Sequence, residues 1–340
     1  MKSNTLLTQL QKVLPLAQGN KVIPITSCIK FDGDKTFTAT DTLNEISITL
    51  ENSGLSTPFC VDAVKFTNIL RGYGDKEVSF KLTDTTIEIK SDKSKYKLPI
   101  EASKDFPEIN AEFKESKDID SLELQNAIKA TSFATSTDDL RPAMNGIYFN
   151  DKEVASTDAH KLVRYDFNHG FNFILPVTSF NLISANLSGE CKISETESHV
   201  KFEMGNATLI SRKIDERFPD YNAVIPVGNQ NKLTINPRKL EDVVKRLLLT
   251  ADANTSAIVL DLSSECKAYS SDVNQSTEGL EQLECQYNGD DLKIGFNGKF
   301  LLDCLRSITD SEVVLELSQP NRAGLFNCKN KIVLLMPVMV

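Results

Sequence analysis

Three unrelated sequence patterns recur along the chain at one interval of about 115 residues. The first is a strand-and-turn segment, read as TFTATDTLNEISITL, EVASTDAHKLVRYDF and CKAYSSDVNQSTEGLEQLE, whose aspartates Asp41, Asp158 and Asp272 are 117 and 114 residues apart. The second is an amphipathic segment that opens each interval: LLTQLQKVLPLA, SLELQNAIKATSFA and NPRKLEDVVKRLLLTA. Such self-similarity at a fixed period is the sequence signature of a repeated structural unit.

A third pattern of helical periodicity confirms the period, because it carries Phe66, Phe180 and Phe300 at intervals of 114 and 120 residues. Between the helical segments lie alternating stretches such as EVSFKLTDTTIEIK and KISETESHVKFEM, which predict antiparallel strands. Each module therefore has the order helix, strands, helix, strands. This order predicts an α+β fold. The polar stretches EFKESKDID and VGNQNK place the module boundaries, giving modules at residues 1–113, 114–228 and 229–340.

The charge of the chain is unevenly distributed over these elements. The net charge is -9, from 38 Lys and Arg against 47 Asp and Glu. The six predicted helices, at residues 2–17, 62–74, 121–136, 178–189, 237–250 and 298–308, total +6 and leave -15 for the remainder. A mildly basic helical face would contact phosphates weakly and without sequence preference. Lysines also favour helix surfaces without any such role, so the charge alone leaves both interpretations open.

Cysteine and histidine usage argues against metal and disulfide chemistry. The seven cysteines are scattered without a CxxC pair, and only three histidines are present. We therefore expect reduced thiols, no metal site and no cofactor. The N-terminus lacks an unbroken apolar region, and nowhere do about 18 apolar residues run together. These features predict a cytoplasmic protein that does not enter a membrane.

Four motifs carry a resemblance to a known family. RPAMNGIYFN, STDAHKL and RKIDERFPDYNAVIP lie in the second module, and the chain ends in KIVLLMPVMV. In this order and spacing they resemble the bacterial DNA sliding clamps, the beta subunits of DNA polymerase III, over essentially the whole chain. The resemblance implies a non-catalytic processivity factor made of three clamp domains, with helices on an inner face and antiparallel sheets outside. It also implies a head-to-tail homodimer that closes a six-domain ring around duplex DNA.

A ring would explain why an acidic chain can have DNA as a partner. A protein that encircles DNA is held by topology, so it does not need the strongly basic surface that tight binding to phosphates requires. The resemblance further implies a hydrophobic pocket between the second and third modules, which receives a short peptide of each DNA polymerase or clamp loader. Matching the motifs assigns to it Arg141, Met144, Thr157, Ala159, His160, Leu162, Pro219, Val224, Gly324, Leu334, Leu335 and Met336. Apolar side chains suit leucine and phenylalanine anchors, and methionine adapts to varied ligands. Ordinary core packing would account equally for the apolar members.

The same family match and the helix charges give two further sets of residues. The residues expected to face DNA are Lys12, Lys21, Lys65, Arg71, Lys129, Lys239, Lys245, Arg246 and Lys299. The dimer contact is expected to involve the first module and Leu248 or Leu249 of the third.

The chain departs from the family pattern at several positions. Ala159 stands where glycine is frequent, Pro142 and Ala143 replace a common aromatic pair, and Met339 stands where arginine is frequent. We therefore expect partner preference to differ from that of other clamps.

Two alternatives belong to other classes of protein. Ser156, Asp158 and His160 are close in sequence and could suggest a hydrolase, but no GxSxG elbow accompanies them. A clamp relative from a phage or mobile element is also compatible with the sequence, and it would either serve one dedicated polymerase or act as a monomeric adaptor. The chain has no GxxxxGK[ST] motif, so a separate loader would have to open a ring.

Overall fold

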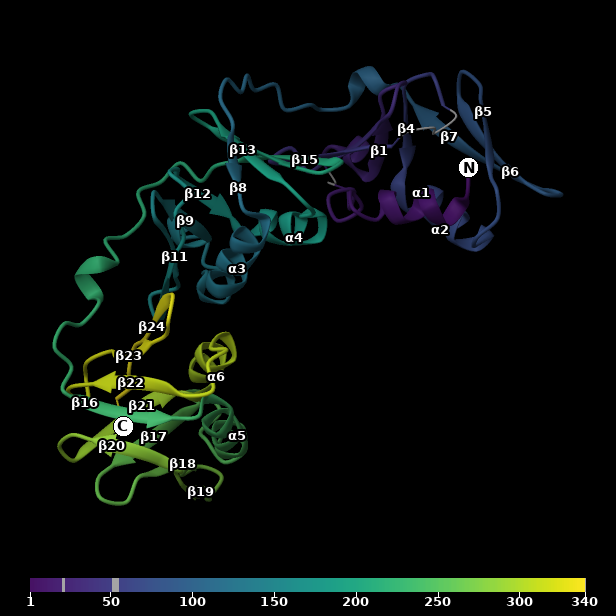
Figure 1. Cartoon of the computed structure of the whole chain (residues 1–340). Helices are drawn as coiled ribbons and strands as arrows, with labels where there is room; N and C mark the ends of the chain where they lie inside the picture. The colour runs from purple at the N-terminus through teal and green to yellow at the C-terminus, as the bar shows by residue number, and fades with distance from the viewer. Residues whose placement is uncertain (20–21, 51–54, 340) are drawn as a thin grey trace. The chain divides into compact units, whose positions relative to one another are not determined.

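The computed structural model describes residues 1–19, 22–50 and 55–339, and each third of the chain follows the predicted order of helix, strands, helix and strands (Figure 1). The first module contains α1 (Ser3–Leu10), β1 (Cys28–Phe31), β2 (Thr36–Thr40), β3 (Asn44–Thr49), β4 (Phe59–Asp62), α2 (Ala63–Tyr73), β5 (Ser79–Leu82), β6 (Thr86–Ser91) and β7 (Ser94–Glu101). The second contains β8 (Lys117–Ile119), α3 (Ser121–Thr131), β9 (Gly146–Asn150), β10 (Glu153–Thr157), β11 (Lys161–Asp166), β12 (Asn172–Pro176), α4 (Val177–Asn186), β13 (Cys191–Glu195), β14 (His199–Met204) and β15 (Ala207–Arg212).

The third module contains β16 (Asn231–Ile235), α5 (Pro237–Leu247), β17 (Ala257–Leu262), β18 (Lys267–Asp272), β19 (Thr277–Gln282), β20 (Cys285–Asn288), β21 (Leu292–Asn297), α6 (Gly298–Ser307), β22 (Val313–Leu317), β23 (Gly324–Asn327) and β24 (Lys331–Leu335). Short 3-10 helices η1 (Pro24–Ser27), η2 (Ser103–Asp105), η3 (Ser132–Ala134), η4 (Pro142–Met144) and η5 (Asn222–Val224) lie in the connections. The predicted α+β class is confirmed.

Short polar side chains start the helices that follow directly on strands. Asp62 accepts a hydrogen bond from the Lys65 amide at the start of α2. Asn236 and Asn297 do the same for the first amides of α5 and α6. Each side chain satisfies amides that have no partner within the helix, so the strand-to-helix transition is specified locally.

The first helix is shorter than the sequence pattern predicts. It ends at Leu10, and residues 11–17 continue in turns in which Leu16 and Ala17 donate to the carbonyls three residues before them. Pro15 has no amide hydrogen and its ring crowds the preceding turn, so a regular helix cannot continue through it.

The chain divides into two compact units, and the division passes through the second module. Unit 1 comprises residues 1–125 and 178–213, and unit 2 comprises residues 126–177 and 214–340. Unit 1 contains one sheet of the order β5-β6-β7-β4-β1-β2-β3-β15-β14-β13-β8. It is continuous across two modules because β3 pairs with β15 from Ile48↔Ala207 to Asn44↔Ser211. The helices α1 and α2 lie side by side against it and bury Leu6, Leu10 and Phe66 (Figure 1).

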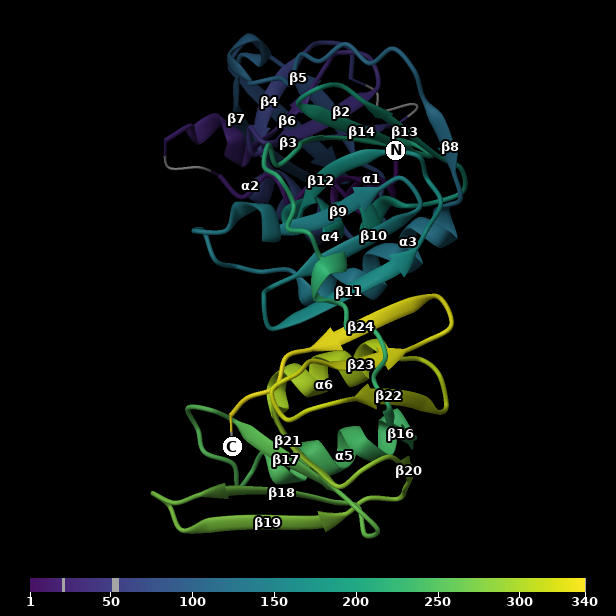
Figure 2. The ribbon, with the colours of Figure 1, turned by 90° about the vertical axis from the view of Figure 1, so that its left-hand side faces the viewer.

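Unit 2 contains two sheets, of the orders β12-β9-β10-β11-β24-β23-β22-β16-β20 and β19-β18-β17-β21. The larger sheet also crosses a module junction, since β11 of the second module lies beside β24 of the third (Figure 2). The helices α5 and α6 pack together on the core of the third module, where Leu240, Val244 and Leu301 are fully buried. Antiparallel pairing across this junction positions the candidate site.

Candidate peptide-binding site at the junction of β11 and β24

The turn between β10 and β11 is shaped by side-chain hydrogen bonds. The Asp158 Oδ1 atom accepts from the amides of His160, at 2.9 Å, and Lys161, at 2.8 Å. The Thr157 hydroxyl accepts from the Ala159 amide and donates to the Lys161 carbonyl. Ala159 has a φ of 73°, a left-handed conformation that glycine adopts with less strain. The turn therefore presents Ala159 and His160 to solvent, while the buried Thr157 stabilises the turn from within.

A buried lysine attaches this turn to the third module. Lys161 is 6 % exposed, and its Nζ atom lies 2.8 Å from Asp158 Oδ2 and 3.4 Å from Asp303 Oδ2 of α6. The same ammonium lies 4.7 Å from the centre of the Phe300 ring, on which the His160 ring stacks at 5.1 Å. Burial lowers the pKa of Lys161, but the hydrogen bond and charge of Asp158, together with Asp303, outweigh it and raise that pKa overall. The lysine is thus a charged link between the two modules.

The strand pairing brings two predicted leucines together. Leu162 pairs with Leu334, and the Met336 amide donates to the His160 carbonyl at 2.8 Å. Leu162 and Leu334 are 3 % and 2 % exposed and share one apolar cluster with Phe218 and Tyr221. Met336 and Val224 stand beside these positions in sequence and remain 40 % and 54 % exposed. The result is an apolar floor, with the exposed apolar side chains of Met336 and Val224 close to it along the chain.

Aromatic packing fixes the segment that contributes Phe218 and Tyr221 to this floor. The rings of Tyr148 and Phe218 stack at 4.9 Å, and Tyr221 meets both edge-on. The Tyr221 hydroxyl donates to Glu153 and accepts from Asn150, so the segment is anchored to β9 and β10. Burial and the Glu153 bond raise the pKa of Tyr221 to about 12, which keeps this hydroxyl protonated as a donor.

The remaining predicted pocket residues divide between the two faces of the sheet. Arg141 is exposed beside Asp138, Met144 is half-buried in η4, and Pro219 is half-buried next to Phe218. Leu335 lies in the core of the third module instead, because successive residues of a strand point to opposite faces. Gly324 pairs with Leu335, and a Cβ atom there would lie 3.1 Å from Leu315, Leu317 and Phe296 of the same core. These two positions support the floor from behind.

The structure adds side chains that the motif match did not assign. Phe218, Tyr221, Ala323 and Leu325 belong to the apolar cluster. Phe218 and Tyr221 stand inside the RFPDY motif, so the motif contained a signal for them. Leu325 follows Gly324 in the strand GLFN, and the alternation of side chains along a strand would have assigned it to the opposite face. The contacts of Asp303 and Phe300 had no local signal, because they depend on the pairing of distant segments.

Comparisons with known proteins agree over the whole chain. Models of the N-terminal, central and C-terminal domains of the DNA polymerase III beta subunit match residues 1–110, 118–220 and 222–337. The chain belongs to the DNA polymerase III beta subunit family. Membership of this family assigns it a non-catalytic role.

Curated relatives and solved structures of this family are similar to most or all of the chain. The beta sliding clamp of Rickettsia felis is 28 % identical over 100 % of this chain and 99 % of its own length. That of Rickettsia bellii is 30 % identical over 72 % of each chain. A crystal structure of the sliding clamp of Bartonella birtlesii bound to griselimycin superposes with a TM-score of 0.93 at 25 % identity, covering 100 % of this chain and 98 % of that one.

The cations predicted to face DNA in this clamp-family chain fall into two groups. Lys239, Lys245 and Arg246 are paired with carboxylates, as is Lys65 with Asp62. Lys12, Arg71, Lys129 and Lys299 form no ion pair with any residue that the structure describes. Lys21 lies outside the described residues. Much of the positive charge of α5 is therefore compensated by neighbouring acids.

Glu241 pairs with three cations, of which only Lys245 belongs to the set predicted to face DNA. It is 10 % exposed and lies 3.0 Å from Lys245, 2.9 Å from Arg238 and 3.2 Å from Arg306. The hydrogen bond from Lys245, followed by those from Arg238 and Arg306, lowers the pKa of Glu241 to about 2. The carboxylate is thus ionised throughout the range in which an isolated glutamate would take up a proton.

This network predicts a pH-dependent contribution to stability. A folded-state pKa below the unfolded value stabilises the fold above about pH 4.5, and this contribution is lost as the pH falls toward about 2. Because the three cations are half exposed and screened, we expect Glu241→Gln to cost only about 1–2 kcal/mol near pH 7. Urea unfolding should show this cost shrinking as the pH falls from about 4.5 toward 2, whereas Glu284→Gln, at a carboxylate 78 % exposed, should change little over this range. A cost independent of pH would contradict the assignment.

The two leucines predicted at the dimer contact differ in exposure. Leu249 is 83 % exposed just after α5. Leu248 is half-buried and packs against the core of the third module. Only Leu249 is fully available for a contact outside the chain.

The hydrolase alternative is not supported by geometry. Ser156 is fully buried and its hydroxyl donates to the Thr131 carbonyl. Asp158 binds the amides of the turn and Lys161, while the His160 ring stacks on Phe300. The three side chains form no catalytic relay.

Metal and membrane features are absent from the part of the chain that the structure describes. Within residues 1–19, 22–50 and 55–339, no cluster of His, Cys, Asp and Glu could hold a metal ion, and no helix is long and apolar enough to span a membrane. The seven cysteines are free thiols.

Proposed function

We propose that the chain is a DNA sliding clamp, a ring subunit that encircles duplex DNA and tethers polymerases through the apolar site at the junction of β11 and β24. The observation that carries this proposal is the pairing of Leu162 with Leu334, which builds an apolar floor beside the exposed Met336 and Val224. Apolar anchors of a short peptide would gain most of their binding energy on such a floor. Arg141 and His160, both exposed at its border, would orient the peptide backbone.

A homodimer would close the ring, and two strand edges support this assembly. β19 is the edge of its sheet, and residues 94–98 of β7 pair only with β6 among the described strands. β7 carries Lys97 and β19 carries Glu278, and neither forms an ion pair with a described residue, whereas Lys95 and Glu281 already pair with Glu88 and Arg246. Opposite charges on two open edges favour pairing between copies. Because the two edges differ, the contact would be head-to-tail.

DNA contact would be weak and independent of base sequence. The four unpaired cations, Lys12, Arg71, Lys129 and Lys299, would meet phosphates, while the paired cations of α5 would contribute less. Binding would then depend on topology. A separate clamp loader would open the ring, and the free thiols fit the reducing cytoplasm, where we place the protein. The module boundaries at residues 114 and 229 remain predictions.

Retention on DNA tests the ring directly. We expect the protein, once loaded, to stay on nicked circular DNA in high salt and to slide off after the circle is cut at one site, because topology and not affinity holds it. Gel filtration of the two DNA samples with labelled protein measures the retained fraction. Equal loss from circular and linear DNA would reject the ring, and a strict monomer in solution would favour the adaptor alternative.

A further inference from the structure

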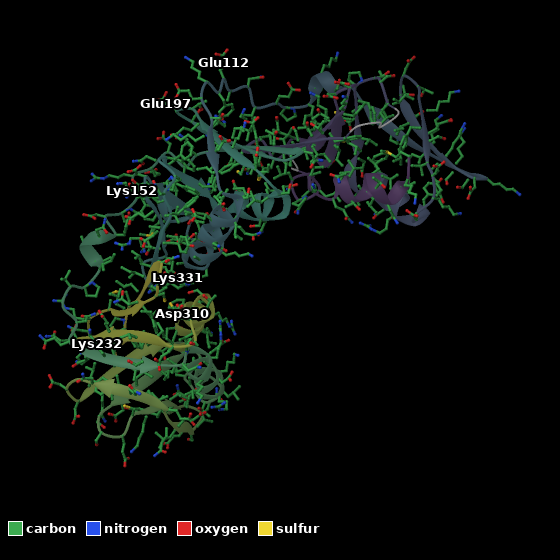
Figure 3. All side chains as sticks on the ribbon, viewed as in Figure 1. Glu112, Lys152, Glu197, Lys232, Asp310 and Lys331 are labelled. Atoms are coloured by element: carbon green, nitrogen blue, oxygen red, sulfur yellow. The ribbon has the colours of Figure 1, made fainter. Side chains whose placement is uncertain are left out.

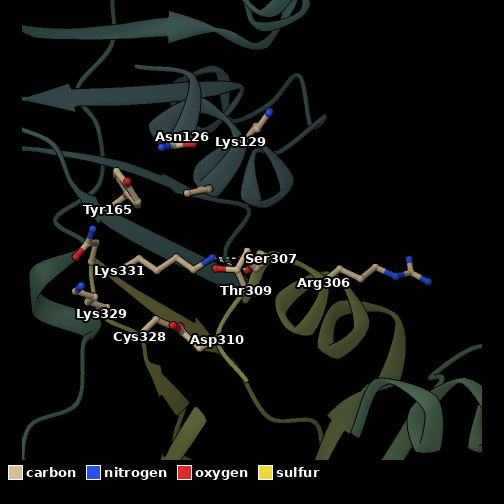
Figure 4. Close-up of a pocket in the computed structure, with 12 residues that line it drawn as sticks. Asn126, Lys129, Tyr165, Arg306, Ser307, Thr309, Asp310, Cys328, Lys329 and Lys331 are labelled. Atoms are coloured by element: carbon tan, nitrogen blue, oxygen red, sulfur yellow. Dashed lines mark hydrogen bonds between the residues drawn. The ribbon is translucent and has the colours of Figure 1, made fainter. Parts of the chain in front are cut away.

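A second concave site lies in unit 2, away from the apolar floor. It is a cavity of about 460 Å³ between the end of α3, β11, the end of α6 and the β23–β24 turn (Figure 4). None of the twelve residues assigned to the peptide site lines it. Its volume falls within the range of about 300–1,000 Å³ that is usual for small-molecule sites.

The wall of this cavity is strongly positive in a protein of net charge -9. Four cations, Lys129, Arg306, Lys329 and Lys331, face one carboxylate, Asp310. Burial raises the pKa of the neighbouring Cys328 thiol to about 11, so this side chain adds no negative charge near pH 7. Because Arg306 is paired with Glu241, the excess is two positive charges, concentrated in a hollow where the field is strongest.

The three lysines of this lining differ from the cations of α5 in lacking carboxylate partners. Lys129, Lys329 and Lys331 form no ion pair with any residue in the described ranges, and Arg306 alone is engaged, by Glu241. Asp310 lies against the Cys328 thiol and likewise has no ion pair there. The positive charge of the three lysines is thus offset only in part, by Asp310.

Lys331 is the most enclosed of the four. It extends across the cavity to Ser307, donating to the Ser307 carbonyl and, at 3.3 Å, to the Ser307 hydroxyl (Figure 4). An ammonium has three donors, so one hydrogen remains for a ligand. Burial lowers the pKa of Lys331, and the charge of Asp310 offsets this effect only in part. Lys129 and Lys329 lie at the rim on flexible stems that can turn toward a bound group.

We propose that this cavity binds a phosphate group, with Lys331 at its floor and Lys129 and Lys329 closing on it from α3 and the β23–β24 turn. The amide side chains of Asn126 and Asn330 and the ring of Tyr165 line the same space and would contact the remainder of a phosphorylated molecule. A free phosphorylated compound and the backbone of duplex DNA both supply this chemistry. The experiment below separates them.

The probe is inorganic pyrophosphate, titrated by calorimetry at low salt into the full-length protein. We expect one site per chain and at least tenfold weaker binding in Lys129→Gln/Lys329→Gln and in Lys331→Met. The matched control is Lys93→Gln/Lys152→Gln, which removes the same charge at two exposed lysines outside the cavity, with Lys152 well separated from Lys331 in Figure 3. Thermal unfolding checks that each variant folds. Lys129→Gln/Lys329→Gln, called the rim variant below, changes only two exposed side chains and leaves all buried contacts unchanged.

The second arm measures the affinity of a short linear duplex for the same proteins. Weaker duplex binding in the rim variant than in the control would identify DNA phosphate as a ligand. Equal duplex binding in the two variants would identify the free phosphorylated compound as the ligand instead. The inference is overturned if pyrophosphate does not bind the unmodified protein or binds the rim variant and the control equally. Retention on circular DNA, measured in parallel, reports on the ring itself, so failure of this inference is distinguishable from failure of the proposed function.

Discussion

Replacing Leu334 and Met336 together by alanine is expected to weaken binding of a peptide of the QLxLF type by about 2 kcal/mol or more, which is about 30-fold in Kd. Leu334 lies in the floor at 2 % exposure, and Met336 borders it at 40 % exposure. Both side chains would lose apolar contact with the leucine and phenylalanine anchors. Fluorescence anisotropy of a labelled peptide measures the change.

Met339→Ala provides the control, since Met339 is 90 % exposed three residues further along the same segment. Like Met336→Ala, it removes a methionine side chain, but one that does not contact the floor. The affinity for the peptide should therefore stay within about twofold of that of the unmodified protein. Leu334→Ala also leaves a cavity in the apolar cluster, so urea unfolding must show that the double variant is folded under the titration conditions. Superimposable titration curves for the double variant and the unmodified protein would refute the site.

Introducing charge at Leu249 and Leu280 is expected to convert the proposed dimer to monomers. Leu249 is 83 % exposed after α5, and Leu280 is 67 % exposed on the edge strand β19. In Leu249→Asp/Leu280→Asp, two carboxylates would have to lose their water in the contact between copies, which we expect to raise the dissociation constant by about 100-fold or more. Sedimentation velocity over a range of concentrations measures this change.

Val227→Asp is the corresponding control, because Val227 is 97 % exposed in the connection between the second and third modules. All three positions are solvent-exposed within one chain, so neither variant should change folding by more than about 0.5 kcal/mol. A double variant that sediments as a dimer at the same concentrations as the control would exclude this surface from the assembly.

The elements themselves were largely predictable from the sequence. The third module illustrates why: Asn236 and Pro237 carry the start signals of a helix, and α5 begins where they predict. Its apolar spacing then places Leu240 and Val244 on the buried face. Such signals act over a few residues, so a single sequence contains them in full.

Pairings between distant segments were not predictable in this way. Summing charge over the helices gave a basic face, but Glu281 and Glu284 approach Arg246 and Lys239 of α5 from the neighbouring strand segment, and only the fold brings them there. Likewise, the motif match included Leu335, which alternation places in the core of the third module. The sequence contained the residues of the site, whereas the register of β11 against β24 decided which of them face it.

That register has a consequence for the synthesis of the chain. The ribosome completes β11 at Asp166, but its partner β24 begins only at Lys331, so nearly half of the chain is made before the pairing can form. During that interval one edge of β11 is an unpaired template for other strands, and nascent second modules are exposed to misassembly with one another. A transcript cut short before the codon for Lys331 would therefore yield a product that has no peptide site and retains this adhesive edge permanently.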